Sequence, residues 1–114
     1  VQYWRKLRMY ATSYHPEALG GDNVTSVGET LRKGIIAIDP RIVPYYTNMY
    51  VEGYGQGIAA DTGGPRSNPY WVDLGYEDHD WENWHWWQDV YLLTPVPDNV
   101  TYLLPETSRG GPVR

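Results

Sequence analysis

The sequence contains neither cysteine nor phenylalanine. The lack of cysteine excludes disulfide bonds, cysteine-ligated zinc and a thiol nucleophile. Basic residues are also few, with nine Lys and Arg against 14 Asp and Glu and a formal net charge of -5. Because a nucleic-acid surface needs a basic face to neutralise phosphates, this balance argues against a nucleic-acid partner. No apolar run approaches the roughly 20 residues that a membrane helix needs.

The aromatic residues are Tyr and Trp alone, 11 and 6 of them. Both side chains join an apolar ring to a polar group, which suits partly exposed positions. Two interpretations follow. The rings form a surface that stacks on sugars, or a small β domain builds its core from them.

The 114 residues suit one domain. Apolar stretches are short and are separated by glycine and proline, a pattern typical of a β-barrel or sandwich. Residues 75–86 are expected to form a helical turn or a structured loop, and residues 15–30 a polar loop. The tail is predicted at 105–114, which leaves 1–104 for the domain. Strands are predicted at 3–14, 34–38, 48–53, 56–61, 70–74 and 87–94.

The first ten residues, VQYWRKLRMY, alternate like a strand and do not resemble a signal peptide. We therefore expect a mature or trimmed chain whose export signal is not included.

Three aspartates end or interrupt apolar strands: Asp39 in IIAIDP, Asp61 in IAADTGG and Asp73 in YWVDLGY. Aspartate is depleted in strands, and a half-buried carboxylate is costly unless it is hydrogen-bonded. Asp61 and Asp73 are therefore interpreted as functional. For Asp39, which precedes a proline, a role in capping a turn is an equal alternative.

The same segments resemble the 3D (three-aspartate) domain family. The resemblance rests on MYATSYHP at 9–16, GIIAIDPRIVPYYTNMYVEGYGQGIAADTGG at 34–64 and VDLGY at 72–76. It implies a mainly β fold, a six-stranded double-psi β-barrel in a single domain. This barrel is similar to the catalytic barrel of membrane-bound lytic transglycosylase A and to the small Sps-type lytic transglycosylases. The stretch GGPRSNPYW departs from the family pattern.

The resemblance implies a lytic transglycosylase that cleaves the MurNAc-β-1,4-GlcNAc bond of peptidoglycan and leaves 1,6-anhydroMurNAc. Asp73 would be the single general acid/base, Asp61 its charged neighbour and Asp39 a support of the local hydrogen-bond network. Such an acid needs a raised pKa, which burial and a nearby carboxylate can supply. Further candidates for substrate contact are Thr12, Tyr14, Thr47, Thr62, Gly63 and Gly64.

The expected partner is a peptidoglycan glycan strand. No cofactor and no metal are expected, and the protein is expected to be a monomer that is secreted or associated with the cell wall. The main alternative is an expansin-like module that binds wall polysaccharide with little or no catalysis.

Two other interpretations are weaker. Asp61-Thr62-Gly63 matches the motif of aspartic proteases, but a dimeric protease of this size needs neither of the other two aspartates. The segment YEDHDWENWHWW at 76–87 contains carboxylates and histidines that could bind a metal. A run of such residues does not establish a coordination geometry, so a solvated loop anchored by Trp81, Trp84 and Trp87 is favoured.

Overall fold

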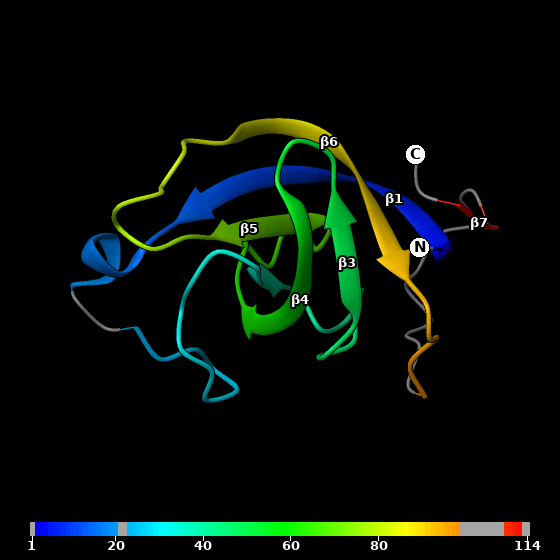
Figure 1. The fold of residues 1–114 in the computed structure, drawn as a ribbon, viewed down its shortest axis with the longest axis horizontal. Helices are drawn as coiled ribbons and strands as arrows, with labels where there is room; N and C mark the ends of the chain where they lie inside the picture. Colours follow the sequence, from blue (N-terminus) through cyan, green and yellow to red (C-terminus); the bar gives the residue numbers. More distant parts are fainter. Residues whose placement is uncertain (1, 21–22, 99–108, 113–114) are drawn as a thin grey trace.

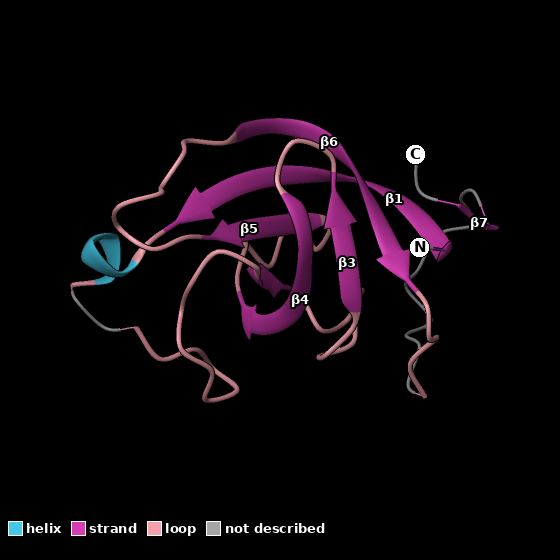
Figure 2. Cartoon of the chain, viewed as in Figure 1, coloured by secondary structure: helices cyan, strands magenta, loops and turns pink. Residues whose placement is uncertain are grey.

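The computed structural model describes residues 2–20, 23–98 and 109–112. Strands dominate this part of the chain, and its one helix is a short 3-10 turn at one end (Figures 1 and 2). The elements are β1 (Gln2–Tyr14), η1 (Pro16–Leu19), β2 (Ile35–Ile38), β3 (Asn48–Val51), β4 (Gly55–Thr62), β5 (Trp71–Gly75), β6 (His85–Leu93) and β7 (Arg109–Pro112). Among the described residues, no helix is long and apolar enough to cross a membrane.

The strands form one sheet in the order β5-β2-β4-β3-β6-β1-β7, and a further pairing of β5 with β1 closes it into a barrel. Six strands make up the closed ring, and β7 pairs outside it with the first residues of β1. This confirms the prediction of a six-stranded double-psi β-barrel in a single domain. Closure leaves these six strands without a free sheet edge.

All six predicted strands are present, with ends within two residues of the expected positions. Strand β7 was not predicted. Residues 76–84 form a loop without a helix, which decides between the two alternatives for that segment. The predicted boundary between residues 104 and 105 lies outside the described residues.

The core fills the barrel interior through the alternation of each strand. In β1, Leu7, Met9 and Ala11 point inward and are buried, while Tyr10 and Thr12 point outward. Strand β2 is buried on both faces, because Ile36 lies in the interior cluster and Ala37 in a second cluster on the outer side. This second cluster consists of Tyr14, Leu31, Ile35, Ala37 and Ala60.

A buried tyrosine joins two strands of the barrel. The Tyr54 hydroxyl donates to the backbone oxygen of Gly75 at 2.6 Å and accepts from the backbone N–H of Gly34 at 2.6 Å. The side chain is 4% exposed, so water cannot readily replace it.

We predict that Tyr54→Phe lowers the free energy of unfolding by about 1–3 kcal/mol, because it leaves two backbone groups without a partner. Urea denaturation would measure the loss. The control is Tyr50→Phe, which removes a hydroxyl from a half-buried ring on β3 and should change stability by less than about 0.5 kcal/mol. Equal losses in both variants would contradict this role of Tyr54.

Candidate functional site

Strand register places two of the three aspartates in one row across the sheet. Ala37 of β2 is paired with Asp61 of β4 on one side and with Asp73 of β5 on the other. Asp73 is paired in turn with Thr12 of β1. Because directly opposite residues point to the same face, these side chains share the outer face to which Ala37 belongs.

Asp73 is half-buried at the centre of this row. The Thr12 hydroxyl donates to Asp73 Oδ1 at 2.9 Å, and the indole N–H of Trp71 donates to the same hydroxyl oxygen at 2.9 Å. Burial raises the pKa of Asp73 to about 6, the Thr12 hydrogen bond opposes the rise and the nearby Asp61 carboxylate adds to it. The protonated form is therefore populated near neutral pH.

Asp61 is surrounded by hydrogen-bond donors. The Tyr14 hydroxyl donates to Oδ2 at 2.8 Å, and the backbone N–H groups of Ser26 and Thr62 donate to Oδ1 at 2.9 and 2.8 Å. Burial, and then the Asp61 carboxylate, raise the pKa of Tyr14 far above its usual value. Tyr14 is thus a hydrogen-bond donor fixed on Asp61.

Thr62 extends this network toward two residues that sequence reasoning missed. Its hydroxyl is 3.1 Å from the Ser26 hydroxyl and is also hydrogen-bonded to the Tyr45 hydroxyl. Ser26 lies in the polar loop after η1, so that loop reaches the site in space. Trp71 was missed as well, and no local motif marks any of the three.

Asp39 lies outside this row of side chains. Its carboxylate forms a bidentate pair with Arg41, with a closest approach of 2.6 Å to Nη2, and accepts the Arg41 backbone N–H at 2.9 Å. The Arg41 side chain also donates to the backbone oxygen of Arg66. The Arg41 hydrogen bond lowers the pKa of Asp39, which favours the charged form. Asp39 thus joins the turn after β2 to the loop after β4.

The hydrogen bond of the Thr47 side chain joins it to neither Asp61 nor Asp73. It is 1% exposed, and its hydroxyl donates to the backbone oxygen of Pro44 at 2.7 Å. This contact stabilises the turn that leads into β3. A substrate contact by Thr47 stays a prediction.

Gly63 and Gly64 have neighbours that leave no room for a side chain. A Cβ at Gly63 would lie 2.9 Å from the Cβ of Ala37 and 3.5 Å from that of Asp73. At Gly64, φ is +88°, and a Cβ would lie 2.9 Å from that of Trp71. Packing inside the protein therefore calls for glycine at both positions, and close approach of a sugar to them stays a prediction.

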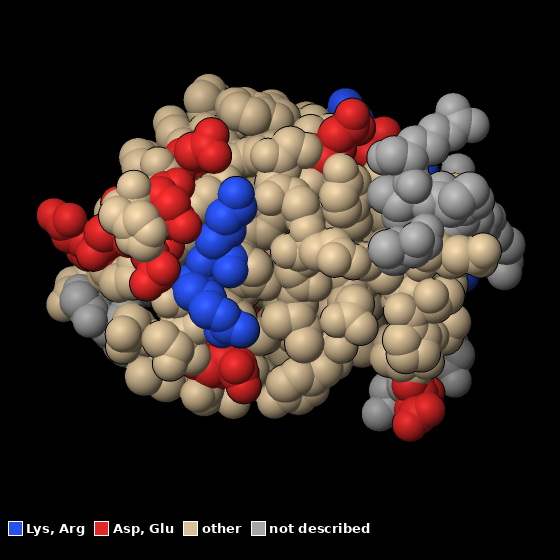
Figure 3. Space-filling model, in the orientation of Figure 1, with Lys and Arg blue, Asp and Glu red and all other residues tan. Residues whose placement is uncertain are grey.

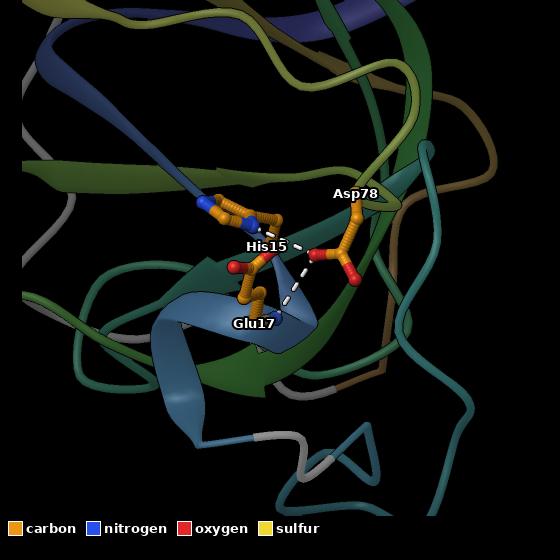
Figure 4. A group of neighbouring side chains, drawn as sticks. All are labelled: His15, Glu17 and Asp78. Atoms are coloured by element: carbon orange, nitrogen blue, oxygen red, sulfur yellow. Dashed lines mark hydrogen bonds and ion pairs between the residues drawn. The ribbon is translucent and has the colours of Figure 1, made fainter.

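The end of the molecule around η1 and residues 76–84 is acidic (Figure 3). Here Asp78 accepts hydrogen bonds from the His15 ring at 2.7 Å and from the Glu17 backbone N–H at 2.9 Å (Figure 4). His15, Glu17 and Asp78 have ligand atoms close enough to hold a metal ion, and so do Glu77, His79 and Asp80. The observed hydrogen bonds attach η1 to the loop.

Of the three tryptophans expected to anchor the 76–87 segment, Trp84 is buried at 7% exposure and donates to the Tyr76 hydroxyl at 2.9 Å. Trp81 and Trp87 are 40% and 48% exposed, and Trp87 belongs to β6. One tryptophan therefore anchors this segment, and the other two are available at the surface.

The fold and the site together define a double-psi β-barrel domain with two aspartates in one row on its outer face. Residues 34–84 match the family model described as the 3D domain. The resemblance seen in the sequence is thereby confirmed.

Two relatives from Bacillus subtilis (strain 168) cover part of the chain. "Cell wall-binding protein YocH" is 42% identical over 64 residues, which are 53% of this chain and 22% of that protein. "Putative cell wall shaping protein YabE" is 39% identical over 57 residues, 46% of this chain and 14% of that protein. The matched regions are thus less than a quarter of each relative's length. No solved structure matches the chain.

We predict that Asp73→Asn stabilises the protein at pH 7.5. The folded-state pKa of Asp73 is raised from 3.8 to about 6, so the folded state holds this proton more tightly. Stability is therefore lost as pH rises from about 4 to about 6, and the loss is complete above that window. At about 1.4 kcal/mol per pKa unit, the variant should gain up to about 3 kcal/mol at pH 7.5.

Urea denaturation at pH 7.5 and at pH 4 would measure this gain, which should disappear at the lower pH. The exposed Asp98 provides the control, since Asp98→Asn alters a carboxylate at the surface and should change stability by less than about 0.5 kcal/mol. An Asp73→Asn effect that is the same at both pH values would contradict the raised pKa.

Proposed function

We propose that this domain is a lytic transglycosylase that cleaves peptidoglycan between MurNAc and GlcNAc, with Asp73 as its single acid/base. The observation that carries the proposal is the half-buried Asp73 carboxyl, which has a pKa of about 6 and shares the outer face with the Asp61 carboxylate, one strand away across Ala37. A general acid works best when its pKa lies near the working pH. The 3D-domain match and the cell-wall names of both relatives support the choice of substrate.

In the first step, protonated Asp73 gives its proton to the glycosidic oxygen as the bond from that oxygen to the anomeric carbon of MurNAc breaks. GlcNAc leaves with a free hydroxyl group. Positive charge develops on the sugar ring, and the Asp73 and Asp61 carboxylates stabilise it.

In the second step, the Asp73 carboxylate takes the proton from the C6 hydroxyl of the same MurNAc. The C6 oxygen bonds to the anomeric carbon, which closes the 1,6-anhydro ring and returns Asp73 to its acid form. One carboxyl group serves both steps because no water enters the product. The rate should fall as pH rises above about 6, since the acid form is then depleted.

The other residues of the site hold these groups in place. Thr12 orients Asp73 through its hydrogen bond, and Tyr14 does the same for Asp61. Asp39, charged and paired with Arg41, supports the loop after β4 and does not transfer a proton.

A second function is favoured by a specific observation, the name "Cell wall-binding protein" of the YocH relative. In that case the domain binds wall polysaccharide without cleaving it. The exposed Trp87 on β6 suits this function as well. The two functions differ in their products.

We predict that the protein releases 1,6-anhydro-muropeptides from purified peptidoglycan and that Asp73→Asn lowers this release by at least about a hundredfold, as expected for loss of a general acid. Mass spectrometry of the soluble products would measure the release. Asp98→Asn should retain full activity. Binding of the protein to peptidoglycan without any soluble product would contradict the enzyme and favour the binding module.

A further inference from the structure

An aromatic row lies beside the row that contains Asp73. Tyr10 of β1 is paired with Trp71 of β5 on one side and with Trp87 of β6 on the other. The Tyr10 ring centroid is 4.7 Å from that of Trp71 and 5.6 Å from that of Trp87. On β5 and β1 these residues stand two positions before Asp73 and Thr12, so both rows share the outer face. We call Trp71, Tyr10 and Trp87 the aromatic strip.

The aromatic strip is fixed relative to the acid. The Trp71 indole N–H donates to the Thr12 hydroxyl, and that hydroxyl donates to Asp73, at 2.9 Å in both cases. On another side, Trp71 packs against Gly64 so closely that a Cβ there would lie 3.0 Å from its Cγ. At the other end of the strip, Trp87 is 48% exposed and offers its ring to a ligand.

Polar groups flank the strip along both sides. On one side lies the row of Asp73, Thr12 and His85. On the other side, Arg8 is paired with Asp89, and their side chains form an ion pair at 3.1 Å. The strip is therefore one residue wide in the strand direction and extends over two strand spacings, roughly 10 Å.

This shape decides between two kinds of occupant. A stable protein partner or a second copy of this chain needs an interface of roughly 1,000 Å² or more with an apolar centre, and a strip bordered by charged residues does not supply one. A sugar ring has apolar C–H faces and a rim of hydroxyl groups. Aromatic rings between hydrogen-bonding rows match both parts of a sugar.

We propose that the aromatic strip binds a β-1,4-linked amino-sugar strand and holds it beside Asp73. The inference rests on the proposed function, since it assigns the sugars next to the cleaved bond to this strip. Trp87 is the main contact, because it is the most exposed ring of the three. Trp71 and Tyr10 position that contact relative to the acid.

The test measures binding without turnover. Asp73→Asn protein would be sedimented with purified peptidoglycan sacculi, alone and combined with Trp87→Ala. We expect Trp87→Ala to weaken binding about tenfold or more, as for an exposed aromatic anchor, and Trp87→Tyr to restore part of the loss. Circular dichroism would confirm that each variant is folded.

Trp86→Ala is the matched control. Trp86 precedes Trp87 on the same strand and is similarly exposed, at 43%. Its partner on β1 is Ala11, which faces the core, whereas the partner of Trp87 is Tyr10 of the aromatic strip. Trp86 therefore does not belong to the strip. The Trp86→Ala variant should bind sacculi within about twofold of the parent protein. Equal losses in the Trp86 and Trp87 variants, or no loss in either, would overturn the assignment of the strip.

Competition identifies the ligand. Soluble β-1,4-linked N-acetylglucosamine oligomers should displace the Asp73→Asn protein from sacculi, and free stem peptides should not. Displacement by stem peptides alone, or a dimer in light scattering that Trp87→Ala dissociates, would overturn the proposal. Failure of the transglycosylase itself would be seen separately, as wild-type protein that binds sacculi through Trp87 but releases no anhydro product.

Discussion

The position of the Asp73 carboxyl, half-buried on the outer face of the barrel, is the constraint on which the rest of the site depends. Burial makes its charged form costly, and the Asp61 carboxylate adds to that cost. The barrel tolerates the group because Thr12, its partner on β1, supplies a hydrogen bond from the next strand. Pairing of β5 with β1 also closes the sheet, so closure of the fold and support of the acid depend on the same contact.

The positions of the strands could be predicted because they depend on local sequence patterns. Alternation in β1 and the short apolar stretches of β2, β4 and β5 located the strands within two residues. The pairing of β5 with both β1 and β2 could not be derived from alternation, because register between distant strands depends on which faces become buried together. The double-psi topology could be predicted only from the resemblance to the 3D domain family.

The candidate site was predicted in part. Asp61 and Asp73 were recognisable because a carboxylate inside an apolar strand needs a compensating partner. Ser26, Tyr45 and Trp71 were not, since their roles arise from contacts across 36, 17 and 59 residues of sequence. In the sequence, Asp39 differed from the other two aspartates only in the proline that follows it, which made a capping role an equal alternative. The structure separates it, because Arg41 two residues later neutralises its charge locally.

Burial raises the pKa of the Asp73 carboxyl to about 6, and carboxyl-carbon NMR of protein labelled at aspartate tests this value most directly. Assignment by comparison with Asp73→Asn would identify the resonance, and titration from pH 3 to pH 8 would give its pKa. We expect a midpoint at about 6. A midpoint at or below about 4, the value of an exposed aspartate, would contradict it.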